Sequence, residues 1–151
     1  MRDPVRIIPL GGLGEVGKNM TVFEARGELI LIDAGLTFPK AEMFGVDLVL
    51  PDFSYVVDRA DQLRAIVLTH GHEDHVGALP YLLRETGPGP VVYGTRLTLG
   101  LVKSRLDEHG LGAETELVEV TPDGSRVQVG PFETEVVRVT HSIPDAVAVV
   151  L

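Results

Sequence analysis

The chain has 151 residues, of which 44% are hydrophobic and 23% charged, a composition typical of one ordinary globular domain. It contains no cysteine, which excludes disulfides and thiolate metal sites. No apolar run reaches the roughly 18 residues of a transmembrane helix, and residues 1–4 lack a signal-peptide pattern. We therefore expect a cytoplasmic protein without a membrane partner. The formal net charge of −9 is the wrong sign for a chain that binds nucleic acid unaided.

Hydrophobic patterning predicts strands near both ends of the chain and helices between them. The strands expected in the first two thirds cover residues 5–10, 20–26, 28–33, 64–69 and 90–93. Gly27 marks a hairpin turn, and a short helix is expected over 76–84. Thr95 is positioned to cap a second helix that runs to about His109, where Gly110 ends it.

The last third of the chain predicts further strands, over residues 114–120, 125–129 and 132–140. Asp123-Gly124 is the expected turn between the first two of these strands. An apolar run over 146–151 has the pattern of a buried strand that reaches the last residue. We interpret this ending as a truncated domain; a terminal strand tucked into a sheet is the alternative.

A cluster of metal-ligand residue types follows the strand expected over 64–69. His70 and His72 are two apart, so they project to the same side of an extended backbone. Asp74 and His75 come where the chain turns into a helix and can face a neighbouring point, so one segment could serve two ions about 3.5–4 Å apart. Imidazole and carboxylate groups favour zinc, with manganese as an alternative. A solvated loop without metal remains the competing interpretation.

Two further residues end predicted strands. His141 follows the strand over 132–140 and is a candidate third imidazole for the first ion; the alternative is a polar loop residue before Pro144. Asp33 ends the strand over 28–33 and is a candidate acceptor for the ring N–H of a ligand histidine, which would fix its tautomer. The alternative for Asp33 is a local turn before Gly35.

Residues 12–17 match the G-x-G-x-x-G pattern of dinucleotide-binding proteins. That pattern requires a helix to open at the glycines, whereas here Lys18-Asn19 leads directly into the alternating strand over 20–26. We therefore predict a turn between strands and no NAD or FAD site.

The motif HGHEDHVGALPYLL resembles the signature of the metallo-β-lactamase superfamily. The segments IPLGGLGEVGKNM, LILIDAGLTFP, GVDLVLPDFSYV and THSIPDAVAVV are more specific and resemble the bacterial ribonuclease J family, of the β-CASP branch. The resemblance extends over all 151 residues. It implies an α/β fold of the αββα metallo-β-lactamase type, of which residues 1–151 form an N-terminal portion, with the β-CASP and C-terminal domains outside the chain.

The resemblance also implies a function, namely RNA processing and decay by metal-dependent hydrolysis of phosphodiesters, as a 5′-to-3′ exonuclease and in some members an endonuclease. Residues matching His70, His72 and His141 bind one ion in that family. Those matching Asp74 and His75 bind the other and are the expected catalytic residues, while a bridging aspartate and a further histidine lie beyond position 151. Two Zn²⁺ ions are expected, with Mn²⁺ or Mg²⁺ as alternatives, in a cytoplasmic homo-oligomer. We expect the 151 residues alone to be inactive.

Two rival interpretations remain at this point. The same fold and signature occur in hydrolases of small esters or thioesters, and the narrower segments argue against that class. A non-catalytic metal-binding piece is the second rival, because the bridging carboxylate is absent from these residues.

Overall fold

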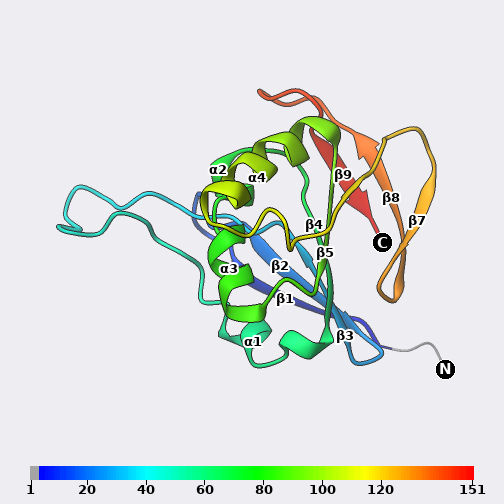
Figure 1. The fold of residues 1–151 in the computed structure, drawn as a ribbon, viewed down its shortest axis with the longest axis horizontal. Helices are drawn as coiled ribbons and strands as arrows, with labels where there is room; N and C mark the ends of the chain where they lie inside the picture. The colour runs from blue at the N-terminus through cyan, green and yellow to red at the C-terminus, as the bar shows by residue number, and fades with distance from the viewer. Residues whose placement is uncertain (1–3) are drawn as a thin grey trace.

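A six-stranded and a three-stranded β-sheet form the framework of the computed structural model, which describes residues 4–151 (Figure 1). Residues 1–3, which carry most of the stretch inspected for a signal peptide, lie outside the described part. The strands of the larger sheet are β1 Arg6–Gly11, β2 Met20–Ala25, β3 Glu28–Ile32, β4 Leu63–Val67, β5 Val91–Gly94 and β6 Leu117–Glu119. They lie in chain order, antiparallel from β1 to β3 and parallel from β3 to β6.

Local sequence explains the central strands of this sheet. The β2–β3 hairpin turns through Arg26 and Gly27, and both residues have positive φ. A two-residue turn needs this conformation if it is to match the twist of the two strands. After Glu28, strand β3 is a continuous apolar run with Leu29, Ile30 and Leu31 fully buried, the pattern of a strand covered on both faces.

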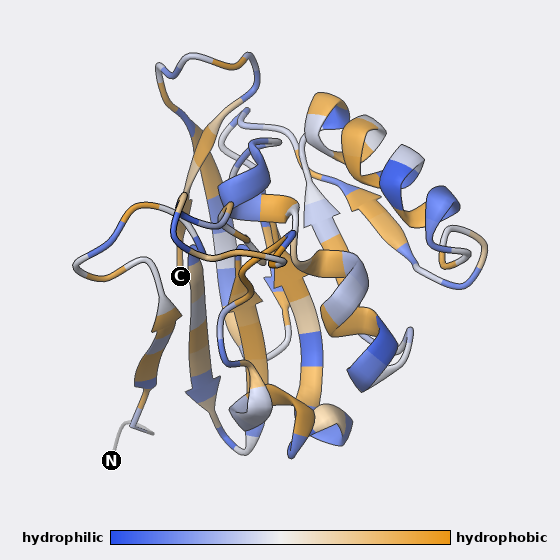
Figure 2. Cartoon of the chain, turned by 90° about the vertical axis from the view of Figure 1, so that its left-hand side faces the viewer, coloured by the Kyte–Doolittle hydropathy of each residue, from blue (hydrophilic) through white to orange (hydrophobic). Residues whose placement is uncertain are grey.

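All the helices of the described residues lie on one face of the six-stranded sheet (Figure 1). They are α1 Ser54–Val57, the 3-10 helix η1 Ala60–Gln62, α2 Glu73–Val76, α3 Leu79–Thr86 and α4 Arg96–Glu108. Hydrophobic and hydrophilic residues alternate along α4 (Figure 2). Its buried residues Leu99, Val102 and Leu106 recur every three to four positions and pack into the core, as in an amphipathic helix.

The three-stranded sheet covers the opposite face. It consists of antiparallel β7 Arg126–Val129, β8 Phe132–Arg138 and β9 Val147–Val150. Val129 and Phe132 pack against Ile30 and Val67 of the large sheet. Phe132 also meets Phe23 edge to face, with ring centroids 6.4 Å apart. The result is a helix–sheet–sheet stack, which confirms the expected α/β class.

Two details of the expected secondary structure are wrong. The helix predicted over 76–84 is divided between α2 and α3, because Pro80 is accommodated only in the first turn of a helix. The Ala78 N–H at the division donates to the carbonyl of Ala34, 2.8 Å away. Asp123-Gly124 does not close a hairpin, because β6 belongs to the large sheet and β7 to the small one.

Other elements differ in extent. The strand expected over 114–120 is only the three residues of β6, and α1 and η1 were not anticipated. Among the described residues, no helix has both the length and the apolar character needed to cross a membrane.

Candidate metal centre

Chain topology gathers the candidate ligands at one edge of the large sheet. Asp33 follows β3, and His70 follows β4 after two intervening residues, so both lie at the carboxyl ends of adjacent parallel strands. This is the edge at which α/β sheets commonly present functional side chains. His141 reaches the same place from the loop between β8 and β9, which lies beside that edge because Val147 N–H donates to the carbonyl of Thr69, 3.0 Å away.

Three imidazoles converge at this edge. One ring nitrogen from each of His70, His72 and His141 lies within 4.8 Å of the others. His70 Nε2 is 3.1 Å from His72 Nδ1 and 3.1 Å from His141 Nε2. His70 is buried, His72 is half-buried and His141 is exposed, so the group opens to solvent on the side of His141.

Asp33 and Thr69 determine which nitrogens of two histidines carry protons. The Asp33 carboxylate accepts a hydrogen bond from the Thr69 hydroxyl, whose Oγ1 lies 2.8 Å from Oδ2. Because the hydroxyl proton is already donated to Asp33, Thr69 Oγ1 acts as the acceptor for the N–H of His70 Nδ1, 3.0 Å away. His75 Nδ1 donates directly to Asp33 Oδ2 at 2.7 Å. Both rings consequently carry their proton on Nδ1 and direct the lone pair of Nε2 away from Asp33.

The pKa values of these two histidines move in opposite directions. Burial, followed by the charges of His75, His141 and His72, lowers the pKa of His70 to about 4, so its ring is neutral near pH 7. For His75 burial also lowers the pKa, but the hydrogen bond and charge of Asp33, together with the charge of Asp74, outweigh burial and raise the pKa. A cation at His75 Nε2 would therefore compete with a proton.

Asp74 and His75 form a second pair of candidate ligands beside the three imidazoles. Asp74 Oδ2 and His75 Nε2 are 3.6 Å apart. The His75 ring packs against that of His70, with centroids 4.0 Å apart. The Asn19 side chain contacts both members of the pair, with Nδ2 3.2 Å from Asp74 Oδ2 and 3.2 Å from His75 Nε2.

Helix α2, which carries this pair, is held in place by the segment after β3. The Ala34 and Leu36 N–H groups donate to the carbonyls of His75 and Glu73, at 2.7 and 3.1 Å. Between them lies Gly35, where a Cβ atom would be 1.6 Å from the carbonyl oxygen of Asp74, so only glycine permits this approach. The Glu73 side chain of α2 pairs with Arg105 of α4, whose two terminal guanidinium nitrogens donate to its carboxylate.

The donor set fits a divalent ion such as zinc. Nitrogens that share a tetrahedral zinc at about 2.0–2.1 Å lie roughly 3.3 Å from one another, close to the 3.1 Å separations around His70 Nε2. Without an ion, that single nitrogen would have to satisfy two other ring nitrogens at once. The three histidines therefore match the chemistry and the spacing of a metal position, and Asp74 with His75 is a candidate ligand pair for a second.

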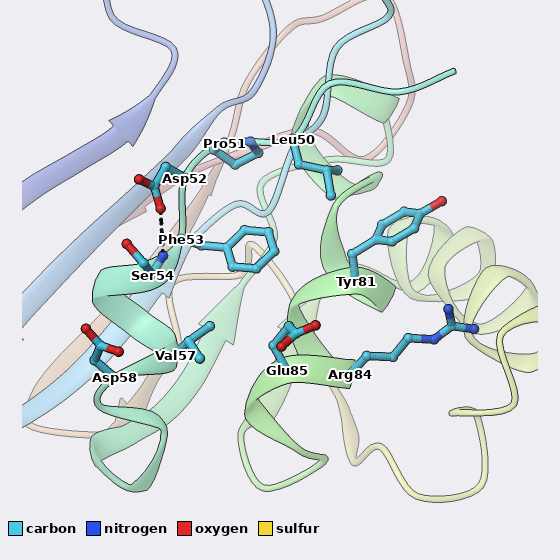
Figure 3. A pocket seen from close by; sticks show the side chains of 10 residues that line it. All are labelled: Leu50, Pro51, Asp52, Phe53, Ser54, Val57, Asp58, Tyr81, Arg84 and Glu85. Atoms are coloured by element: carbon cyan, nitrogen blue, oxygen red, sulfur yellow. Dashed lines mark hydrogen bonds between the residues drawn. The ribbon is translucent and has the colours of Figure 1, made fainter. Parts of the chain in front are cut away.

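Cavity volume does not locate this site. A surface cavity of about 540 Å³ lies between α1 and α3, lined in part by Phe53, Val57, Tyr81 and Arg84 (Figure 3). None of the clustered histidines lines it. It holds no constellation of ligand or nucleophilic groups comparable to the one at the sheet edge.

All six residues singled out in the sequence lie in this one cluster, including His141 and Asp33, whose sequence signals were weaker. The expected hydrogen bond from a histidine to Asp33 is present, whereas the metal-binding roles stay predictions. The glycine-rich residues 12–17 form a turn between β1 and β2 and no helix, which confirms the expected geometry. Sequence reasoning missed Thr69 and Asn19; for Thr69, its place directly before His70 was an available signal.

Comparison with known proteins agrees with this architecture. Residues 13–145 match the family described as the metallo-beta-lactamase superfamily. The chain is 49% identical to ribonuclease J of Thermus thermophilus, over 99% of its own length and 27% of that protein. It is 47% identical to ribonuclease J of Helicobacter pylori strain 26695, over 97% of its length and 21% of that protein. The resemblance drawn from the sequence motifs is thus confirmed.

A likeness to solved structures supports the fold alone. A diphosphatase of the PhnP family superimposes with a TM-score of 0.66 at 20% identity, covering 97% of this chain and 62% of that one. The chain spans about a quarter of the length of the curated relatives it matches. From the matched residues 13–145 and the clustered HGHEDH motif, we conclude that the chain belongs to the metallo-β-lactamase superfamily.

Proposed function

We propose that this chain provides the N-terminal part of the metal centre of a ribonuclease that hydrolyses RNA phosphodiester bonds. The observation that carries the proposal is the convergence of His70, His72 and His141 beside Asp74 and His75. The substrate class rests on the relatives named ribonuclease J, which are 49% and 47% identical over almost the whole chain. As in the family that the sequence resembles, the activity would be 5′-to-3′ exonucleolytic, with endonucleolytic cleavage as an additional mode.

The residues of the centre take distinct roles in this proposal. His70, His72 and His141 would hold one ion, and Asp74 and His75 would contribute to the other. Divalent ions bound there supply Lewis-acid activation of water and neutralise charge on the phosphate. Asp33 keeps His75 and, through Thr69, His70 in the tautomer that leaves Nε2 free. Asp74 would also orient the attacking water. Zinc is the proposed metal, and its identity, the oligomeric state and the cytoplasmic location stay predictions.

The test uses the protein at its natural length, supplied with Zn²⁺ or Mn²⁺ and 5′-monophosphorylated RNA labelled at its 5′ end. We expect release of labelled mononucleotides, and a His72→Ala variant should lose roughly 10²-fold in rate because it removes a ligand. His109→Ala is the matched control, since His109 lies at the end of α4 outside the cluster. Hydrolysis of small esters with intact RNA would instead favour the rival class, and full activity of His72→Ala would contradict the proposed centre.

A further inference from the structure

Asn19 is the polar residue of the site that the proposed mechanism leaves without a role. It follows the glycine-rich turn of residues 12–17 and directly precedes β2. Its side-chain nitrogen Nδ2 lies 3.0 Å from the main-chain oxygen of Asp74, 3.2 Å from Asp74 Oδ2 and 3.2 Å from His75 Nε2. One amide thus contacts both candidate ligands of the second ion.

The partners of this amide establish its orientation. A main-chain carbonyl and a carboxylate only accept hydrogen bonds, so the group that faces Asp74 is the NH₂ and not the carbonyl of Asn19. Asn19 therefore acts on this site as a donor and does not present an oxygen ligand to an ion. His75 Nε2 meets the same NH₂ and must accept, which agrees with the proton on Nδ1 beside Asp33.

Main-chain hydrogen bonds hold the Asn19 amide beside Asp74. Asn19 N–H donates to the carbonyl of Asp74 at 3.0 Å, and Gly35 N–H donates to the carbonyl of Asn19 at 2.9 Å. Gly12 makes room for the side chain, because a Cβ at that position would lie 2.6 Å from Asn19 Oδ1. The glycine pattern that resembles a nucleotide fingerprint thus has a different physical role, as a turn that delivers Asn19 to α2.

We propose that Asn19 is a positioning residue for the second metal position, holding the Asp74 carboxylate beside His75. The inference rests on the proposed metal centre and adds a residue that acts through Asp74 without touching the ion. When an ion takes the lone pair of His75 Nε2, the amide gives up that contact and keeps its two bonds to Asp74. Removing the amide should then weaken the second ion and leave the ion at His70, His72 and His141 unchanged.

The test is a Co²⁺ titration of the metal-free protein at its natural length, followed by visible absorption and by calorimetry. Two variants are compared with the wild type, Asn19→Ala and the nearly isosteric Asn19→Leu, which fills the same volume without donors. We expect the weaker of the two Co²⁺ affinities to fall by roughly 10–100-fold, the usual cost of losing a group that orients a ligand. The tighter affinity should change by less than about 2-fold on the same basis. Gln128→Ala is the control, because the amide of Gln128 donates to the carbonyl of Gly130 in the turn between β7 and β8.

The outcomes separate this inference from the proposed function. If the wild type binds no Co²⁺, the proposed metal centre itself is contradicted. Two ions in the wild type with unchanged affinities in both Asn19 variants would overturn the role of Asn19 alone, as would a second ion that binds more tightly, since the amide would then be a competitor. Loss of the folded circular-dichroism spectrum in both variants without metal would also overturn it, by assigning Asn19 to the fold.

Discussion

At the residue scale, the Asp33 carboxylate serves two histidines, one directly and one through a hydroxyl. It accepts from His75 Nδ1 and from Thr69 Oγ1, and Thr69 in turn accepts from His70 Nδ1. Asp33 adopts a positive φ of 60°, a left-handed conformation that aspartate tolerates better than most residues. The backbone strain of this conformation occurs at the residue whose carboxylate orients both imidazole rings.

Replacing Thr69 by valine, which has the same shape without the hydroxyl, should release the His70 tautomer. We expect His70 to populate the Nε2–H form, visible in the ¹⁵N shifts of its ring, because its Nδ1 proton loses its acceptor. The affinity of the metal-free protein for its first Zn²⁺ should fall by roughly 10–100-fold. Thr69→Ser keeps the hydroxyl and should restore both readouts; a serine variant as weak as the valine one would show that the methyl group matters instead.

At the element scale, α1 is attached to the sheet through one short hydrogen bond. Tyr55 Oη donates to Glu24 Oε2 of β2 at 2.5 Å. That bond is the main reason why the pKa of the Glu24 carboxyl lies below 4.5, with a smaller contribution from Arg6. The Arg59 guanidinium stacks over the Tyr55 ring, 4.1 Å from its centroid, and packs against the side chain that makes this bond.

This attachment predicts a pH-dependent contribution to stability. Because folding depresses the pKa of Glu24, the contribution is present above the unfolded value of about 4.5 and is lost as the pH falls through the folded value. Tyr55→Phe should lower the free energy of unfolding near pH 7 by on the order of 1 kcal/mol. The difference in unfolding free energy between wild type and variant should become smaller below pH 4.5. Urea unfolding of both proteins across that range measures it. A gap that widens on acidification would contradict the assigned donor.

The order and type of most elements could be predicted because each carries a local pattern. Strand β3 is apolar from its second residue to its last, and the buried apolar residues of α4 recur every three to four positions. The division between α2 and α3 had a local signal in Pro80, which stands in the first turn of α3, whereas the partner of the Ala78 N–H at that division, the carbonyl of Ala34, is distant in sequence. The sheet to which β6 and β7 belong is likewise decided by packing partners far along the chain, which a turn signal at Asp123-Gly124 does not report.

The site followed the same division between local and distant information. The HGHEDH segment was recognisable because its ligands are adjacent in sequence. Asn19 was not, because its partners Asp74 and His75 are 55 and 56 residues away and a lone asparagine carries no pattern. Its place beside a glycine-rich turn indicated a loop and gave no hint of the helix against which it packs.

At the scale of the whole molecule, charge limits what these residues do by themselves. The chain carries 22 acidic residues against 13 Lys and Arg, a balance that repels a polyanion. Bound divalent ions would offset the negative charge only at the sheet edge. The proposed RNA substrate would therefore need cationic groups contributed from outside these 151 residues.

The number of protein ligands predicts how many ions the 151-residue chain retains. His70, His72 and His141 offer three ligands to the first position, whereas Asp74 and His75 offer two to the second. Sites with so few protein ligands bind weakly, and without a bridging carboxylate nothing offsets the repulsion between two nearby cations. After dialysis against metal-free buffer, elemental analysis should find at most one Zn²⁺ per chain. Two retained ions would show that the second position is complete without further ligands.

The contact between His70 and His141 joins positions 71 residues apart and connects the two β-sheets. An ion bound there would cross-link the two sheets in the folded chain and would be released on unfolding. Its contribution depends on supply: at a free metal concentration 100 times the dissociation constant, it adds about 2.7 kcal/mol to the folded state. The free metal concentration would thereby set how stably the small sheet is held against the large one. A shortage of the ion would lower the stability of the fold as well as the activity.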